Sequence, residues 1–513
     1  PFFLNAYGST DSRFELNTHF NTQLSQKWSS SLFVHGNTRV SKMDQNNDGF
    51  MDNPLAKQIN VMNRYQYYDA EKGLVSFINF RYMNDKKQSG EVDFDPDRDR
   101  GATNRWGSEI NTQRLDLATK VGYVFKDMPF QSIGFQNAFT LHNQNSYYGL
   151  NVYDIKQNSF YSNLIFNSII NNTKHKFATG INFAYDNYNE FVGLTDYGRV
   201  DNSVGAFFEY TYDNDDNFSL VLGGRVDNHN RLGTFVTPRL HLRYNPWEKS
   251  VLRFSAGRGK RAANIFAENQ SLFASSRTFS ILDTDGKIYG LNPEIAWNYG
   301  LSFNQKFQLF GRNGDAGFDL YRTDFQNQAV VDVMQSPQQV LFYNLKGKSY
   351  ATSLQIEFNY ELANRFSLRS AYKYYDIQTQ YLSGVYQRPL QAKHRFFGNL
   401  EYETGRSESG SQWRFDATYN WLGKQQLPVT ASNPAQDRLP EFSPSYNLIN
   451  AQVTHVFSSN FEIYVGGENI GNYKQSKAIL GAETPFGPTF DASIVYAPIF
   501  GQMYYAGLRF KIK

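Results

Sequence analysis

The sequence predicts an all-β protein, a transmembrane antiparallel β-barrel of about 22 strands with short periplasmic turns and long extracellular loops. Apolar and polar residues alternate with period two along many segments, as they do in a wall with two different faces. Short and long connections alternate along the chain, so one rim has tight turns and the other has elaborate loops. The chain is polar, with a mean hydropathy of −0.57, yet 17% of its 513 residues are aromatic.

Composition excludes several other classes of protein. No stretch approaches the roughly 18–20 uninterrupted apolar residues of a transmembrane helix. The aromatic content argues against disorder. The 51 basic and 48 acidic residues leave a net charge of +3, which indicates no nucleic-acid partner. The absence of Cys excludes disulfides, thiolate metal sites and cysteine nucleophiles.

The chain begins with a strand-like segment, Pro1 to Tyr7, which has neither the basic nor the apolar region of a signal peptide. Strand patterns follow at once and continue to Lys513. We therefore expect residues 1–513 to form one barrel domain. We also expect a leader upstream of this chain. A barrel of about 22 strands is too wide for side chains to fill, so either a plug domain precedes Pro1 or the barrel is an open pore.

The strand pattern is clearest in four segments, where one face is apolar or aromatic and the other polar or charged. Going along the chain, these are 239–244, 354–361, 365–374 and 508–513. A soluble sheet and a barrel wall both accept this pattern. The connections decide between them.

The connections fall into two sets that alternate along the chain. The short, turn-like links are 25–27, 69–73, 213–217, 245–249, 311–314 and 458–460; the long links are 40–56, 88–106, 259–291, 380–389, 425–443 and 475–499. Transmembrane barrels keep this asymmetry between their two rims, whereas a soluble sandwich has no reason to. The aromatic clusters 65–68, 372–375 and 504–505 suit interfacial girdles, although ordinary β-propensity also explains them.

The spacing of several short motifs resembles the C-terminal barrel of TonB-dependent outer-membrane receptors, in particular those of Bacteroidetes-type bacteria. The stretches that carry the resemblance are 237–244, 252–261, 291–300, 321–325, 467–470 and the closing strand to Lys513. Together they cover the chain from about residue 235 onward. Each motif is weak alone, and their order and spacing are more specific.

The resemblance implies a 22-stranded barrel in the outer membrane of a Gram-negative bacterium, with a plug and a segment that contacts the TonB complex. It implies a receptor that imports a scarce small nutrient, for which we favour a metal ion or a metal chelate such as a siderophore. The expected partners are outer-membrane lipid, the TonB complex, a small-molecule substrate and, as a further candidate, a surface lipoprotein. A passive porin, or a TonB-dependent importer of glycan or peptide, stays open as an alternative.

One long link contains a candidate calcium loop, 44–52. Its oxygen-bearing side chains Asp44, Asn46, Asp48 and Asp52 fall at positions 1, 3, 5 and 9 of a calcium loop, with Gly49 at the sharp turn. Position 12 is Leu55 instead of a bidentate Glu, so the loop is not an EF-hand. A solvated Asn/Asp/Gly loop tip is the alternative. No other cofactor is expected.

The next long link crowds the acidic residues Glu91, Asp93, Asp95, Asp97 and Asp99. A second cation site is conceivable here, but a flexible charged loop is the favoured interpretation.

Basic and amide side chains gather at the base of the longest central link. We expect Arg258, Lys260 and Arg261 to line the mouth of the lumen and attract an anionic substrate or pair with a plug. With Asn264, Glu268 and Asn269 they are the candidate substrate residues. No catalytic constellation is visible, so we expect no enzyme.

Overall fold

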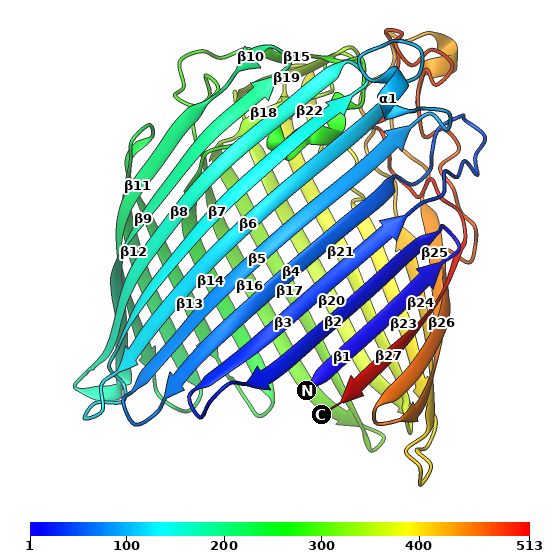
Figure 1. Cartoon of the computed structure of the whole chain (residues 1–513). Helices are drawn as coiled ribbons and strands as arrows, with labels where there is room; N and C mark the ends of the chain where they lie inside the picture. Colours follow the sequence, from blue (N-terminus) through cyan, green and yellow to red (C-terminus); the bar gives the residue numbers. More distant parts are fainter. Residues whose placement is uncertain (513) are drawn as a thin grey trace.

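The computed structural model describes residues 1–512. Strands dominate it and run obliquely around a closed barrel (Figure 1). Of the 24 strands in the main sheet, β10 (Thr195–Asp196) and β22 (Gly384–Gln387) belong to outer hairpins, and the other 22 close the wall, as the sequence predicts. No helix among the described residues is long and apolar enough to cross a membrane.

The strands of the first half of the wall include the longest of the barrel. They are β1 (Phe2–Ser9), β2 (Arg13–Gln23), β3 (Trp28–Arg39), β4 (Leu55–Asp69), β5 (Leu74–Gly90), β6 (Gly107–Val124), β7 (Ser132–Tyr148), β8 (Asn151–Ile170), β9 (Asn172–Val192), β11 (Arg199–Asp213) and β12 (Phe218–His229). A strand needs only about 9–11 residues to cross the bilayer. The 20 residues of β8 and the 21 of β9 therefore extend the wall beyond the membrane.

The second half completes the circle. Its strands are β13 (Gly233–Tyr244), β14 (Ser250–Arg261), β16 (Glu294–Leu309), β17 (Arg312–Asn327), β20 (Ser349–Ala363), β21 (Phe366–Tyr381), β23 (His394–Glu403), β24 (Gln412–Leu422), β25 (Tyr446–Ser458), β26 (Phe461–Glu468) and β27 (Met503–Ile512). β27 pairs antiparallel with β1, from Phe2 opposite Ile512 to Ser9 opposite Tyr505. This pairing removes the last free sheet edge.

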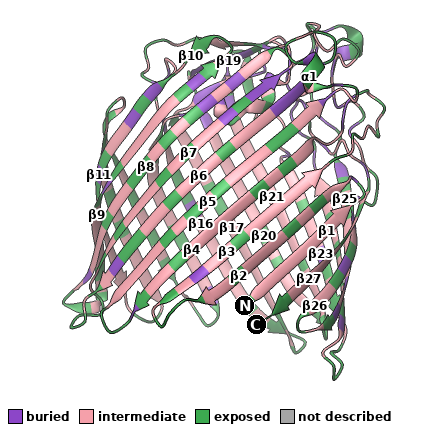
Figure 2. Cartoon of the chain, in the orientation of Figure 1, coloured by how far each residue is buried: buried purple, intermediate pink, exposed green. Residues whose placement is uncertain are grey.

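Side-chain alternation gives the wall an apolar outside and a polar inside. On β2, Phe14, Leu16 and Phe20 are exposed on the outward face. On the lumenal face of the same strand, Arg13 forms an ion pair with Glu15. Most wall residues are of intermediate exposure, and buried residues gather mainly toward one end of the barrel (Figure 2).

The two rims differ as the sequence predicts. One rim carries the tight turns and both chain termini, and the other carries the loops (Figure 1). The alternation of lengths is less strict than expected, because three outer links, 10–12, 149–150 and 230–232, are as short as the turns. We take the rim with the termini as the periplasmic one.

Several outer loops contain structure that the sequence did not predict. Loop 91–106 carries the short helix α1 (Pro96–Asp99), and loop 423–445 carries the 3-10 turn η2 (Ala435–Asp437). Loop 262–293 carries the 3-10 segment η1 (Ala267–Phe273) and β15 (Thr278–Ile281). β15 joins β18 (Ala329–Asp332) and β19 (Gln339–Asn344) of loop 328–348 in a separate three-stranded sheet.

Candidate functional site

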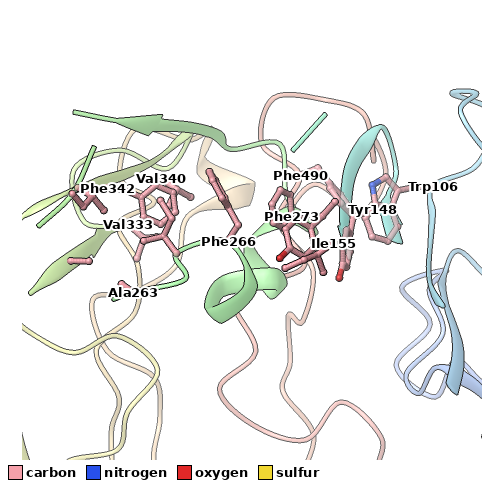
Figure 3. Packing of buried hydrophobic residues seen from close by; sticks show 14 of the residues in the cluster. Trp106, Tyr148, Ile155, Ala263, Phe266, Phe273, Val333, Val340, Phe342 and Phe490 are labelled. Atoms are coloured by element: carbon pink, nitrogen blue, oxygen red, sulfur yellow. The ribbon is translucent and has the colours of Figure 1, made fainter. Parts of the chain in front are cut away.

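The outer loops fold together around one apolar cluster, which we call the mouth core. Its residues come from five loops and from the ends of β7 and β8: Phe50, Trp106, Tyr148, Tyr153, Ile155, Ala263, Ile265, Phe266, Phe273, Leu291, Ala329, Val333, Val340, Phe342 and Phe490. Figure 3 shows the labelled members side by side. The mouth core therefore joins segments that are hundreds of residues apart.

Aromatic rings make up the centre of the mouth core. Phe273 stacks against Phe279 of β15 with ring centroids 4.6 Å apart, and against Tyr153 of the barrel wall at 5.4 Å. Phe490 packs on Trp106 at 4.9 Å. Tyr148 and Tyr153 share the lumenal face of their strands, so the loops pack inward against the inner wall.

A buried polar network ties loop 262–293 to the wall beneath the mouth core. Arg199 donates from Nε to Asp201 Oδ2 at 3.0 Å and from Nη1 to Glu190 Oε2 at 3.1 Å. Nη1 also donates to Tyr289 Oη at 2.7 Å, and Nη2 donates to Asn264 Oδ1. Glu190 is fully buried and accepts a further hydrogen bond from Tyr153 Oη at 2.9 Å. Burial and the Glu190 charge raise the pKa of Tyr289.

Two further ion pairs join loops to one another. Arg277 of loop 262–293 donates from Nε to Asp491 of loop 469–502 at 2.9 Å, and both side chains are buried. Lys477 of loop 469–502 lies 3.3 Å from Asp437 of loop 423–445. Asp437 also accepts hydrogen bonds from Thr489 Oγ1 at 2.8 Å and from the Gly481 N–H at 3.1 Å. A buried charge that lost its partner would be costly, so these pairs favour one arrangement of the loops.

The predicted substrate residues lie together in sequence but not on one face. Arg258 and Lys260 share the face of Phe254 and Ala256, which is the outward one, because β14 alternates without a break against β16. Arg258 donates to Gln326 Oε1 at 3.1 Å, and Lys260 donates to the Leu232 carbonyl at 3.0 Å. The Arg258 side chain therefore does not line the lumen, contrary to the expectation from sequence. The Lys260 ammonium lies 4.3 Å from the ring centroid of Phe235, which is on the lumenal face of β13.

The other four candidates lie at the base of loop 262–293 and hold its conformation. Arg261 makes a two-pronged contact with Glu268, at 2.8 and 2.9 Å, and donates to Glu294 at 2.6 Å. Glu268 also accepts the backbone N–H of Asn264 at 3.0 Å, and Asn269 donates to the Ile265 carbonyl at 2.7 Å. Arg261 is therefore ion-paired with two carboxylates, those of Glu268 and Glu294.

The candidate calcium loop is closed by its own hydrogen bonds. Asp44 accepts the backbone N–H groups of Asp48 at 3.2 Å and Gly49 at 2.9 Å, and Asp52 accepts that of Gln45 at 2.7 Å. Burial and the neighbouring carboxylates raise the pKa of Asp52 to about 6. Within residues 1–512, no three His, Cys, Asp or Glu side chains are grouped so as to hold a metal ion. Calcium binding by Asp44, Asn46, Asp48 and Asp52 stays a prediction.

The second acidic loop is organised around ion pairs. Asp95 caps α1, and Asp99 is buried against Arg98 at 2.7 Å, whose hydrogen bonds lower the pKa of Asp99 to about 2. Glu91 pairs with Arg105 at 2.9 Å. Asp95, Asp99 and Glu91 are thus engaged in contacts within the loop.

Sequence reasoning missed the residues that hold the mouth together. Arg199, Glu190, Tyr289, Arg277 and Asp491 carried no motif. Their partners lie up to 214 residues away in sequence, so only the fold brings them together. One feature of the sequence could have helped. The period-two alternation along β14 places residues 258 and 260 on one face of the strand and residue 261 on the other.

A closed 22-strand antiparallel barrel with one loop-bearing rim defines a Gram-negative outer-membrane protein. Residues 44–470 match the family model described as TonB dependent receptor-like, beta-barrel. The chain belongs to this family. Comparison with curated proteins found no match.

Several solved structures share the fold. A ferric enterobactin receptor mutant from Pseudomonas aeruginosa is 12% identical, with a TM-score of 0.73 over 99% of this chain and 80% of that one. FpvA of P. aeruginosa, bound to a heterologous pyoverdine, is 12% identical at a TM-score of 0.71 over 99% and 71%. The siderophore receptor PirA from P. aeruginosa is 11% identical at 0.65 over 100% and 80%. Identities this low show the fold alone.

Proposed function

We propose that this barrel imports a scarce small nutrient across the outer membrane, driven by the TonB complex through a plug domain. The nutrient class that we favour is a metal ion or a metal chelate such as a siderophore. Membership of the receptor family supports the transport role. The similar structures described as ferric enterobactin and siderophore receptors support the substrate class.

The observation that carries the proposal is the packed mouth. A passive pore works best with an open entrance, whereas here five loops share one apolar core and lie against the inner wall. The loops are held by pairs such as Arg277–Asp491 and Arg199–Glu190. A ligand that binds to these loops and displaces them would couple its own binding to opening of the barrel mouth.

Within this proposal, the candidate substrate residues predicted from the sequence have different roles. Arg261, Asn264, Glu268 and Asn269 position loop 262–293, on which a ligand would seat. Arg258 faces outward, directly opposite Trp297 of the outer aromatic pair Trp297 and Tyr299. There it suits the anionic headgroups of the outer leaflet better than a lumenal substrate.

The first test is the intact mass and N-terminal sequence of the protein extracted from its native outer membrane. The proposal predicts a mass well above the 59.1 kDa of this chain, with a domain of about 100–150 residues before Pro1. A mass equal to that of this chain would favour the porin. Liposome swelling separates the two directly, because only a porin passes small sugars without an energy source.

The second test separates the substrate classes. A deletion strain should grow more slowly than its parent when iron, copper or another transition metal is limiting, and should recover when the gene is restored. Normal growth under metal limitation, with a defect on a polysaccharide or peptide as sole carbon source, would instead favour the glycan or peptide importer.

A further inference from the structure

At the seam between β13 and β14, two neighbouring strands of the wall stop pairing before either strand ends. Going toward the outer rim, their ladder ends where Arg239 lies opposite Gly257. Beyond this point, residues 233–238 of β13 stay paired with β12, and residues 258–261 of β14 stay paired with β16. Both strands therefore remain regular above the break, but they no longer pair with each other.

Pro238 explains where the ladder ends. A proline has no backbone N–H, so it cannot donate to a neighbouring strand. The pairing with β12 runs past Pro238 without a break as far as Gly233, so the missing donor is on the side of β14. Above this point the Lys260 side chain crosses the break and donates to the Leu232 carbonyl at 3.0 Å.

The break also indicates the height of this part of the wall in the membrane. Sheet edges with unpaired backbone groups do not occur against hydrocarbon, so the edges at 233–238 and 258–261 lie at the level of the lipid headgroups or above it. Trp297 lies opposite Arg258 in the ladder of β14 and β16, and Trp is enriched at this level. The wall just below the break therefore faces the outermost part of the hydrocarbon layer.

An apolar hollow of about 690 Å³ lies in the outward face of the wall at this place. Small residues form its floor and larger apolar side chains surround them: Gly224, Pro238 and Ala256, then Phe208, Leu240 and Trp297. A Cβ atom added to Gly224 would meet no atom within 4 Å, so the space above this residue is open. Arg239 also lines the hollow, but its charge belongs to the lumenal face, where it pairs with Glu209.

A cation stands at the upper edge of the hollow. Arg258 follows Gly257, so it would be the next partner of Pro238 if the ladder continued. It shares the outward face with Ala256 and lies about 7 Å further along the strand, toward the outer rim. Its Nε donates to Gln326 at 3.1 Å, and within residues 1–512 its two Nη groups form no hydrogen bond or ion pair. On this face of the wall, the neighbour of the guanidinium is the membrane.

We propose that the seam binds one membrane lipid that has an anionic, phosphate-bearing headgroup. The phosphate lies at the Arg258 guanidinium, and an acyl chain lies in the hollow below it. Guanidinium groups bind phosphate oxygens through charge-assisted hydrogen bonds. Backbone N–H groups on the unpaired strand edges are further donors at the same level. This role goes beyond nutrient import and does not depend on it.

The test is the quenching of Trp297 fluorescence by lipids with brominated acyl chains, in phosphatidylcholine vesicles that contain the full-length protein. Bromine quenches a tryptophan that it contacts, and Trp297 lines the hollow. The difference between the wild type and Trp297→Phe isolates its emission. Brominated phosphatidylglycerol should reach half-maximal quenching at a mole fraction about fivefold lower than brominated phosphatidylcholine, as expected for one basic residue at a membrane surface.

The headgroup preference should depend on one cation. Arg258→Gln should make the two brominated lipids equally effective. Lys57→Gln is the matched control, because Lys57 shares the outward face of β4 with the exposed Ile59 on another part of the wall, and its removal should leave the preference unchanged. Equal quenching by both lipids in the wild type, or an undiminished preference in Arg258→Gln, would overturn the proposal.

A second pair of variants tests whether a chain lies in the hollow. Gly224→Leu fills the hollow without meeting protein atoms at its Cβ, so both brominated lipids should quench Trp297 less. Gly398→Leu adds the same side chain to the outward face of β23, where the Cβ would meet only the Phe396 ring at an ordinary contact distance, and quenching should not change. Undiminished quenching in Gly224→Leu would contradict the position assigned to the acyl chain.

Discussion

Arg199 shows how one residue can fix a loop to a barrel wall. Its guanidinium reaches two acids of the wall, Glu190 and Asp201, and two groups of loop 262–293, Asn264 and Tyr289. The same side chain therefore neutralises a buried carboxylate of the wall and holds the loop in its conformation. Its removal leaves Glu190 buried without its cation, which is the costly half of a buried ion pair.

We expect Arg199→Met to loosen loop 262–293 by about 3–5 kcal/mol, the usual cost of breaking a buried pair. Hydrogen exchange should show lost protection in this loop and little change in β2 or β24. The control is Arg322→Met, because Arg322 pairs with an exposed Asp324 on the outward face and such pairs contribute only about 0–1 kcal/mol. Similar losses in both variants would contradict the anchoring role.

Asp437 gives the loops a pH dependence with a definite sign. Its burial opposes ionisation, but the hydrogen bonds from Thr489, Lys477 and the Gly481 N–H outweigh this and lower its pKa. A carboxyl whose pKa is lower in the folded state stabilises that state above its unfolded pKa of about 3.9 and loses this contribution as the pH falls through the folded value. Protection of loop 469–502 should therefore be constant from pH 7 to 5 and fall below pH 4.

The Asp437→Asn variant provides the comparison for this titration. It should lower protection of loop 469–502 at pH 7 and flatten the acid-dependent loss. An unchanged acid profile would assign the loss to another group.

Hydrogen exchange in loop 44–52 tests the prediction that this loop binds calcium. If the loop binds calcium, millimolar calcium should increase its hydrogen-exchange protection at pH 7, where the raised pKa of Asp52 reflects an uncompensated buried charge. Asp48→Ala should abolish the increase. Identical exchange with calcium and with a chelator would leave the loop closed by its own hydrogen bonds alone.

At the same scale, the sequence predicted the place of the charged residues better than their roles. The segment from 258 to 269 does lie at the base of a large outer loop, as predicted. Period-two alternation already separates Arg258 and Lys260 from Arg261, so their opposite faces were predictable. The partners Glu268 and Glu294 were not, because ion pairing depends on how the loop returns to the wall.

At the scale of elements, the strands follow from local pattern and the loop structure does not. The predicted strand at 365–374 is the start of β21, which the alternation identifies without tertiary information. The sheet of β15, β18 and β19 joins two loops separated by a barrel hairpin. Its residues are buried by contacts such as Phe266 against Phe342, which no local pattern contains.

Phe266 links several of these elements. It is 1% exposed and its ring lies 4.9 Å from Tyr197, 5.6 Å from Tyr289 and 5.6 Å from Phe342. Phe266→Ala should cost about 3–5 kcal/mol of local stability, as other buried Phe truncations do. Hydrogen exchange should rise in β15 and β19 while the wall strands keep their protection.

A matched control is available in a turn at the opposite rim. Phe310 is 89% exposed, so Phe310→Ala should leave exchange in the mouth unchanged. An effect of Phe266→Ala spread evenly over the wall would mean that the mouth core and the barrel unfold together.

At the scale of the whole molecule, the closure of the barrel and its number of strands were predictable, because both follow from the number of amphipathic segments in the sequence. An even number of amphipathic segments with tight turns at one rim allows few architectures besides a membrane barrel. The asymmetry of the rims then fixes the direction of the barrel in the membrane. The mouth core could not be predicted from such a count, because it joins Phe50, Trp106 and Phe490 across more than 400 residues.

The central claim, energised import, is tested most directly by uptake of metal into cells. Elemental analysis should be made on metal-starved cells of the parent, the deletion strain and the restored strain after a short exposure to siderophore-bound iron and to other chelated metals. The account predicts that one metal accumulates in the parent and restored strains only, and that a protonophore abolishes the difference. Equal accumulation in all strains, or uptake that survives the protonophore, would contradict it.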